Sequence, residues 1–405
     1  MKQIKLSITE NYVSHWSWWQ GARELMQNAI DTEDFNIYFS KDDSNQGKIT
    51  IISRGGVVPV SGLLMGVSTK RDDDSKIGKF GEGLKVGLLV LVREGADIVI
   101  ENGNDLWIPN MVYDTVYEQN ILAVDIHEKA LSGRDSNTVT VIIENIPHCA
   151  MSEIMNNYAP TTERTVVIQN DRGKAYTKLY NAADEYQNEE EDGSITGGDC
   201  NLFVNGLFVT RVPGNFKFDY DFKPEAFTLD RDRDSANTFE VKYEANRLLS
   251  ESDDIELLAR LALEQYDDLA LFSERRAKTS GGYYWGQSRT QEDQDDLTKT
   301  AVKLFSEKYG KDSFPIDDSW TDGKKRVVTQ MAISKGYTPV TVKNPVYRMV
   351  QKEYAVDESV QEVLSFKPLE FLEGFLKRHE RRLVAKPRKE LEKTIQMLRI
   401  AGGKE

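Results

Sequence analysis

Hydrophobic positions follow two rhythms at the start of the chain, one helical and one typical of strands. Between 17 and 34 apolar residues return every three or four positions, which predicts a helix. Short apolar runs at 36–39 and 48–53, separated by the polar stretch 40–47, predict two strands joined by a turn. The chain is therefore expected to open with a helix followed by a hairpin.

The same rhythms continue to about residue 150. A second helix is predicted over 84–94, and Gly95 is placed to end it. Three more strand-like runs are found at 96–103, 121–128 and 137–146. Because helices are interspersed with strands of one sheet, we expect 1–150 to form an α/β domain of the two-layer α+β sandwich kind.

The next hundred residues predict a smaller α/β segment over 151–250. Its stretch 181–199 is acidic and contains glycines, which is typical of a loop or hinge. Asn205-Gly206 lies between two apolar runs and predicts a β-hairpin, and 216–222 reads as a further strand. Ser235 is the expected cap of the helix that follows.

The remaining residues, 251–405, predict a helix-rich region. Helical periodicity covers 252–276, and the polar, Gly/Ser-rich stretch 277–298 predicts a linker. The end of the chain predicts a basic amphipathic helix.

Composition narrows the class of protein. The net charge of −14 argues against a surface that coats nucleic acid or anionic membrane as a whole. Two cysteines, Cys149 and Cys200, form no disulfide framework or metal motif, which fits a reducing compartment. The start of the chain has no apolar signal core, and the longest apolar run, 84–92, is shorter than the roughly 20 residues of a membrane helix. We therefore expect a soluble, cytoplasmic protein without a membrane partner.

The first helix contains the first candidate chemistry. Glu24, Asn28 and Asp31 stand at i, i+4 and i+7, so they share one helical face. Taken alone, this spacing favours a solvated polar stripe.

The second candidate is the glycine-rich segment at 78–85. Gly78, Gly81 and Gly83 stand directly before the predicted apolar helix, where glycine allows backbone amides to approach an anion. The chain has no GxxxxGK[ST] sequence, so a Walker-type phosphate loop is excluded.

The order of these motifs resembles the GHKL ATPase superfamily, which includes gyrase, heat-shock chaperones, histidine kinases and MutL. An acid–amide helix precedes `SRGG` at 53–56, then `GVSTK` at 66–70, `IGKFGEGLK` at 77–85 and a strand with Thr138. The resemblance covers about residues 1–145 and is strongest to MORC-type and heat-shock-chaperone-like members. It implies a Bergerat ATP-binding domain with a mixed sheet backed by helices, and a transducer-like or extension segment after it.

The resemblance also implies roles for individual residues. Glu24 would be the general base for the attacking water, and Asn28 would supply an oxygen to Mg²⁺. The lid glycines would cover the phosphates, and Thr138 would lie near adenine. The implied ATP contacts are Asn28, Asp31, Ser53, Gly55, Lys70, Gly78, Lys79, Phe80, Gly81, Glu82, Gly83, Leu84, Lys85 and Thr138.

One residue departs from the family pattern. Ser53 stands where the family has an aspartate that accepts a hydrogen bond from the adenine amino group. A neutral acceptor forms a hydrogen bond about half as strong as a charged one, so adenine selectivity is in question. The basic residues that could reach the nucleotide from the second region are Arg211, Lys217, Arg231 and Arg233; local ion pairs are the favoured reading of the last two.

We expect an ATPase that binds ATP and Mg²⁺, and whose lid closure drives conformational change or homodimerisation that acts on a protein or nucleic-acid client. The alternative is a nucleotide-gated binding protein with little or no hydrolysis. Residues 377–399 contain nine basic residues against three acids. This tail could contact nucleic acid or another partner, but a solvated helix face is favoured. A histidine kinase is disfavoured because His379 follows the ATPase motifs instead of preceding them.

Overall fold

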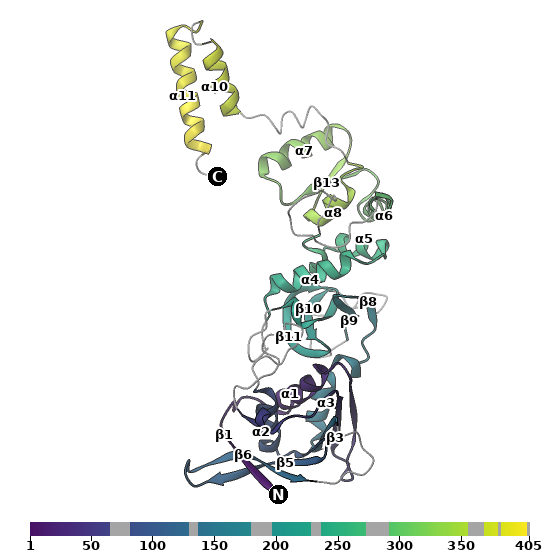
Figure 1. Ribbon diagram of the computed structural model, residues 1–405. Coiled ribbons are helices and arrows are strands. Elements are labelled where there is room, and N and C mark those ends of the chain that lie inside the picture. Colours follow the sequence, from purple (N-terminus) through teal and green to yellow (C-terminus); the bar gives the residue numbers. More distant parts are fainter. Residues whose placement is uncertain are drawn as a thin grey trace. The chain divides into compact units, whose positions relative to one another are not determined.

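The computed structural model describes residues 1–64, 82–128, 137–179, 197–227, 236–272, 291–354, 368–379 and 382–402. The chain divides into two compact units (Figure 1). The first contains Met1–Asp253 and Tyr266–Leu271, and the second contains Asp254–Gln265 and the described residues from 291 onward. Residues 151–250 therefore lie in the same unit as 1–150. The three-part division at 150 and 250 stays a prediction.

The first sheet has seven strands in the order β1-β6-β5-β4-β7-β3-β2. Its described strands pair antiparallel throughout, so the expectation of a mixed sheet was wrong. The strands are β1 (Lys2–Thr9), β2 (Phe35–Lys41), β3 (Gly47–Arg54), β4 (Asp97–Asn102), β5 (Asp105–Asp114), β6 (Gln119–Glu128) and β7 (Thr138–Ile146).

Helices lie against one face of this sheet (Figure 1). They are α1 (Trp18–Ile30), α2 (Gly83–Arg93) and α3 (His148–Asn156), with the short 3-10 helices η1 (Val60–Leu63) and η2 (Ala159–Thr161) nearby in the chain. Alternate residues of β7 are buried, among them Val139, Val141 and Ile143, and they join the side chains of the helices in one core. The unit thus contains a mixed α/β arrangement with helices stacked on a sheet.

The first predicted helix is shorter than expected. It begins after Ser17, whose N–H and hydroxyl both lie 2.9 Å from Oε1 of Gln20. It ends at Ile30, whereas the prediction ended at 34, because Glu33 adopts a φ of 67° that a right-handed helix excludes. The second predicted helix is confirmed: α2 ends at Arg93, and Gly95 follows with a φ of 96°.

The second sheet has five strands in the order β11-β10-β12-β9-β8. The predicted hairpin is confirmed, since Asn205 and Gly206 join its strands β10 and β11 with φ values of 50° and 80°. The elements of this region are β8 (Val166–Asn170), β9 (Gly173–Thr177), β10 (Gly198–Val204), β11 (Leu207–Phe216), β12 (Phe218–Phe222), η3 (Pro224–Ala226), α4 (Thr238–Ser250) and η4 (Asp267–Leu269). The cap of α4 is Asn237, which accepts from the N–H of Phe239 at 2.9 Å, and not Ser235, which lies outside the described residues.

Strand β12 is buried on both faces. Phe218, Tyr220 and Phe222 alternate with Asp219 and Asp221. Because successive side chains of a strand point to opposite faces, one face is aromatic and the other acidic. The acids therefore lie inside the protein and not in solvent.

Each buried acid of this sheet is bound by groups of the chain itself. Asp219 accepts from the N–H of Asn201 at 2.8 Å and from Nε of Arg164 at 3.0 Å. Asp221 accepts from the N–H of Gly206 at 2.8 Å. These bonds offset part of the cost of burying the charges.

A third buried acid, Asp268 of η4, contacts the same sheet. Its Oδ2 accepts from the N–H of Lys217 at 2.7 Å, and its Oδ1 accepts from the hydroxyl of Tyr220 at 2.5 Å and from the N–H of Phe218 at 3.3 Å. Burial raises the pKa of Asp268. Its carboxylate thus joins η4 to the start of β12.

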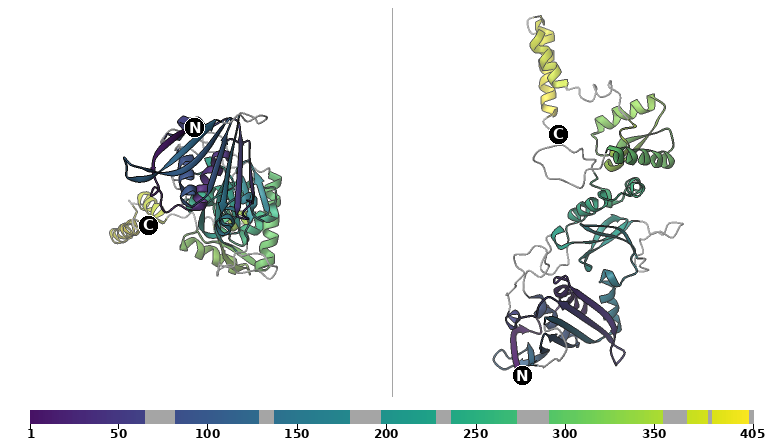
Figure 2. Two further views of the ribbon diagram at one scale, coloured as in Figure 1. Left: turned by 90° about the horizontal axis from the view of Figure 1, so that it is seen from below. Right: turned by 45° about the vertical axis from the view of Figure 1, so that its right-hand side comes forward.

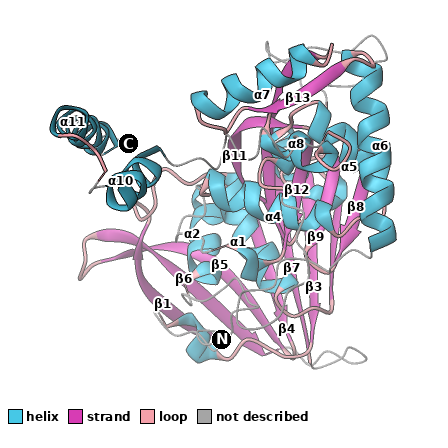
Figure 3. Ribbon diagram, turned by 90° about the horizontal axis from the view of Figure 1, so that it is seen from above, coloured by secondary structure: helices cyan, strands magenta, loops and turns pink. Residues whose placement is uncertain are grey.

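The second unit contains a parallel pair of strands, β13 (Ser313–Asp317) and β14 (Thr338–Val342), together with helices (Figure 3). Its helices are α5 (Ile255–Leu263), α6 (Gln291–Tyr309), α7 (Asp322–Ser334), α8 (Asn344–Val350), α10 (Pro368–His379) and α11 (Ala385–Gly402). The predicted linker extended too far, because α6 already begins at Gln291. The predicted basic terminal helix is confirmed as α11. Within the described ranges, no helix combines the length and apolar character that crossing a membrane requires.

Candidate functional site

Glu24 lies where α1 and α2 contact each other, and it is 5% exposed. Nη2 of Arg23 donates a hydrogen bond to its Oε1 at 3.2 Å. Its Oε2 occupies the space that a side chain on Gly83 would need. Because Gly83 is the first residue of α2, the carboxylate lies beside the positive end of the helix dipole. Both contacts fix the carboxylate of Glu24 at the start of α2.

Two further glycines allow α1 and α2 to approach closely. A Cβ added to Gly21 would lie 2.8 Å from Cγ of Leu91, and one added to Gly87 would lie 3.0 Å from the carbonyl oxygen of Gly21. Glycine inside a helix costs about 1 kcal/mol relative to alanine. Gly21 and Gly87 therefore weaken their helices locally, but they allow the close packing of α1 and α2 around Glu24.

Asn28 and Asp31 follow Glu24 on α1 at one and two helical turns. Asn28 is partly buried, and its Nδ2 has no hydrogen-bond partner within the described part of the chain. Asp31 is 4% exposed and ends the helix, with its N–H donating to the carbonyl of Gln27 at 2.9 Å. The structure thus brings the predicted acid, amide and acid together on one helix, with both acids buried.

A clamp of hydrogen bonds joins α2 to the segment before α1. The guanidinium of Arg93 donates to the carbonyls of Glu10, Tyr12, Val13 and Trp16 at 2.7–3.4 Å. The ring of Trp16 lies against Val86 and Val90 of α2. The end of α2 is therefore fixed to residues 10–16.

The loop after β3 is open at its glycines and fixed just beyond them. Gly55 and Gly56 have φ values of 110° and 152°, and nothing lies within 4 Å of a Cβ added to either. The amide of Asn102 both accepts from the N–H of Val58 and donates to its carbonyl, each at 2.8 Å. Glycine adopts a positive φ without strain, which explains why glycine occupies both positions.

The sheet register separates the two residues expected near adenine. Ser53 pairs with Val139, and Thr138 pairs with Arg54. Paired residues share a face and neighbours along a strand alternate. Ser53 therefore lies on the face of buried Val139, toward the helices, and Thr138 lies on the opposite face. The register brings Ser53 to the side of Glu24 and gives no support to a shared contact with Thr138.

Lys85 is buried in α2. Its Nζ donates to the carbonyl of Leu64 at 2.5 Å, and burial lowers its pKa although Glu82 acts in the opposite direction. It lies two residues after Gly83, or about 200° around the helix. Lys85 thus points away from Glu24, and its geometry does not support the expected phosphate contact.

The other residues near the start of α2 have structural contacts. Glu82 precedes the helix, and its Oε2 accepts from the hydroxyl of Tyr12 at 3.5 Å. Leu84 packs against the core of the first sheet. Five predicted contacts lie outside the described residues, and they are Lys70, Gly78, Lys79, Phe80 and Gly81.

The basic candidates of the second region have local contacts where they are described. Arg211 Nε lies 3.3 Å from Oδ2 of Asp199, and Nζ of Lys217 lies 5.5 Å from the ring centre of Tyr266. Arg231 and Arg233 are outside the described ranges.

Sequence reasoning missed Arg23, Gly21, Gly87 and Asn102. The two glycines carried a usable signal, since a glycine inside a helical pattern often marks close packing. Arg23 and Asn102 carried none, because their roles depend on neighbours brought by the fold. In the described ranges, no three histidine, cysteine or acidic side chains gather in a group that could hold a metal ion by themselves.

No protein-family model matches the sequence, and no curated protein matches it. The resemblance to GHKL ATPases therefore depends on the sequence motifs alone.

Proposed function

We propose that this protein binds Mg²⁺ and ATP in a GHKL-type site along α1 and hydrolyses the nucleotide. The observation that carries the proposal is the placement of Glu24, a carboxylate that is 5% exposed and lies between Arg23 and the first residue of α2. Burying a carboxylate costs solvation free energy. Ionisable groups in such unfavourable surroundings are concentrated at functional sites.

The residues beside Glu24 fit a metal-bound triphosphate. Asn28 is partly buried and its Nδ2 has no described partner, so this nitrogen could donate a hydrogen bond to a phosphate oxygen while the amide oxygen faces the metal. An amide oxygen suits Mg²⁺, which is bound by few protein groups together with water and phosphate oxygens. When bound, the metal would neutralise phosphate charge. The chain itself would contribute the Asn28 oxygen.

Glu24 would orient the attacking water and accept its proton. A general base must lie on a rigid support, and the α1–α2 contact with its close-packed glycines supplies one. Arg23 would position the carboxylate through its bond to Oε1. The other oxygen, Oε2, lies on the side of Gly83. Ser53, which lies on the same side of the sheet, would accept a hydrogen bond from the amino group of adenine.

The test compares phosphate release by the native chain with Mg-ATP against Glu24→Gln, which keeps the shape of the side chain. We expect binding of ATP to remain and turnover to fall by about 10²–10⁴-fold, the usual contribution of a general base. Glu153→Gln, a change to an exposed residue of α3, is the matched control and should leave turnover unchanged. Equal turnover in Glu24→Gln and the native chain would refute the role of Glu24.

A second candidate is a nucleotide-gated binding protein that does not hydrolyse ATP. It is favoured by the hydrogen bond of Arg23 to the carboxylate and by the neutral Ser53. In this case ATP binds to the native chain and to Glu24→Gln alike, and neither releases phosphate. Loss of binding on Asn28→Ala, with no turnover in any variant, would support this candidate over the enzyme.

A further inference from the structure

Helices α10 and α11 pack against each other, and one face of α11 is free of that packing. Ile395 is the buried residue of the contact, at 5% exposed, and Leu391 and Leu398 lie one turn to either side of it. Near the other end of the pair, Nη2 of Arg399 donates to Oε1 of Glu373 at 2.6 Å. The apolar face of α11 is thereby assigned to α10.

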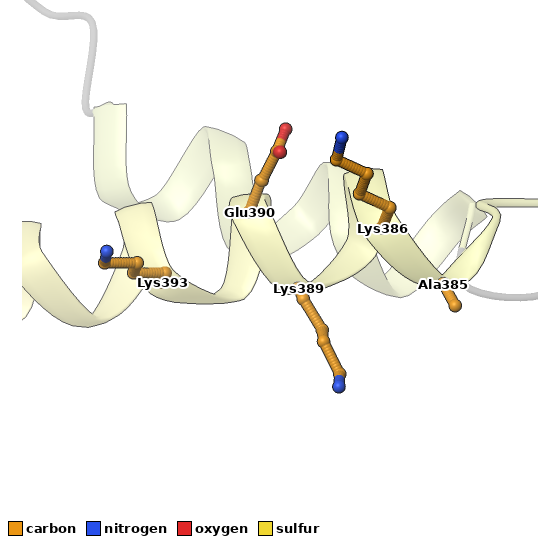
Figure 4. Close-up of a pocket in the computed structure, with 5 residues that line it drawn as sticks. All are labelled: Ala385, Lys386, Lys389, Glu390 and Lys393. Carbon is orange, nitrogen blue, oxygen red and sulfur yellow. The ribbon is translucent and has the colours of Figure 1, made fainter.

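Three lysines occupy the side of α11 away from Ile395. Lys386, Lys389 and Lys393 are exposed and stand at i, i+3 and i+7, within about 60° of the helix circumference. We refer to them as the lysine face. Figure 4 shows them around a shallow depression that Ala385 and Glu390 also line, with Lys386 and Glu390 projecting to one side of the helix and Lys389 to the other.

The lysine face differs from the other cations of this helix. Arg388 pairs with Glu392 at 2.9 Å, and Arg399 pairs with Glu373. The ammonium groups of the lysine face have neither an ion pair nor a hydrogen bond to any residue that the structure describes. Glu390 is the one acid among them, so it offsets only part of the positive charge of the three lysines.

Two further features add positive potential at the same end of the helix. The N-terminus of α11 begins at Ala385, and its dipole is positive there. The last turn of α10, which is separated from α11 by five residues, contains Lys377 and Arg378. This local excess of positive charge contrasts with the net charge of −14 for the whole chain.

The lysine face is long enough to reach several phosphates of a duplex. A rise of about 1.5 Å per residue separates Lys386 from Lys393 by about 10 Å along the helix axis, and each strand of a duplex carries one negative charge per roughly 3.4 Å of the duplex axis. Helix α11 contains no aromatic residue on which an unpaired base could stack. We propose that the lysine face binds the phosphate backbone of double-stranded nucleic acid. This site is separate from the proposed nucleotide site and does not depend on it.

Fluorescence anisotropy of a short labelled DNA duplex, titrated with the full-length chain without ATP, tests the proposal. Three phosphate contacts predict a slope of about −2.7 for log K against log salt, or about a 40-fold loss of affinity between 50 and 200 mM salt. The triple substitution Lys386→Gln, Lys389→Gln and Lys393→Gln should remove this salt-dependent binding. An RNA duplex of the same sequence, measured in parallel, shows whether the lysine face prefers DNA or RNA.

The matched control changes three exposed lysines of the same unit, Lys299→Gln, Lys303→Gln and Lys311→Gln. It alters the net charge by the same amount and should leave duplex binding unchanged. Glu390→Gln should tighten binding, because it removes the one acid beside the lysines. Absence of binding at 50 mM salt, or a triple variant with the native affinity and slope, would overturn the proposal. Stronger competition by polyglutamate than by unlabelled duplex would instead assign the face to an acidic protein.

Discussion

The two sheets of the first unit differ in how they accommodate charge. In the first sheet the inward positions of a central strand such as β7 are apolar, and its buried acids lie at Glu24 and Asp31 in the helical layer and at Asp114, the last residue of β5. In the second sheet the charges lie within a strand, at Asp219 and Asp221 of β12.

The partners of these groups explain the difference. Asp219, Asp221 and Asp268 receive bonds from backbone N–H groups that neighbouring elements place beside them. On α1, the amide of Asn28 keeps a nitrogen without a described partner. Buried polar groups whose bonds are complete stabilise a fold, whereas a group left incomplete is available to a ligand. The comparison therefore indicates a structural role for Asp219, Asp221 and Asp268, and it is consistent with the ligand contact proposed for Asn28.

The largest effect is expected from Asp268→Leu. This change leaves the N–H groups of Lys217 and Phe218 and the hydroxyl of Tyr220 without their acceptor. We expect the free energy of unfolding to fall by about 3–5 kcal/mol, measured by urea denaturation. Tyr220→Phe, which removes a single donor, should cost about 1–2 kcal/mol. Equal losses for the two variants would show that the carboxylate does not act through its several bonds.

The second effect concerns pH. Burial raises the pKa of Asp221 to about 6, although the N–H of Gly206 opposes the shift. The neutral acid is favoured in the folded state, so its stabilisation is complete below the unfolded pKa near 4 and is lost as pH rises to about 6.

Asp221→Asn should remove this dependence. Relative to the native chain, the variant should gain about 3 kcal/mol of stability between pH 4 and pH 7. Urea denaturation of both chains across this pH range measures the difference in their free energies of unfolding. The contributions of the other acids are the same in both chains and cancel in this difference. A difference between the chains that does not vary with pH would show that Asp221 is already ionised at low pH.

The smallest effect on stability, with a larger one on activity, is expected from Gly83→Ala. The new Cβ would overlap Oε2 of Glu24, and the flexible carboxylate would move aside. We expect a stability change of about 1 kcal/mol and a loss of phosphate release measured with Mg-ATP.

Gly323→Ala in α7 is the control for this substitution, since nothing lies within 4 Å of its Cβ. It should stabilise the protein by up to about 1 kcal/mol and leave turnover unchanged. If Gly83→Ala released phosphate at the native rate, the position of the Glu24 carboxylate would not determine catalysis.

Periodicity in the sequence predicted most of the first sheet, because its strands have one buried face and alternate accordingly. It missed β1 at the start of the chain and β5, which contains Pro109. That proline is tolerated because β4 pairs with β5 only over Asp105–Trp107, so Pro109 has a partner strand on one side alone.

The second sheet shows where periodicity fails. The alternation of 216–222 correctly predicted a strand, but alternating aspartates are also what a solvated face would show. Burial of Asp219 and Asp221 depends on Arg164, Asn201 and Gly206, which are distant in sequence. No local pattern encodes such partners.

For the candidate site, the motifs predicted Glu24, Asn28 and Asp31 on one face of a helix, and the structure has them on α1. Their proposed chemistry is not tested by the fold. Lys85 shows the limit of the motif, because its position beside a glycine-rich segment says nothing about the direction of its side chain. Its burial is set by the neighbouring carbonyl of Leu64.

The four carbonyls bound by Arg93 have a mechanical consequence. Because the guanidinium of Arg93 binds four carbonyls between residues 10 and 16, this stretch and α2 are held together as one rigid piece. Any rotation of the helix against the stretch would strain several charge-assisted hydrogen bonds at once. A rotation of α2 that kept these bonds would therefore have to carry residues 10–16 with it.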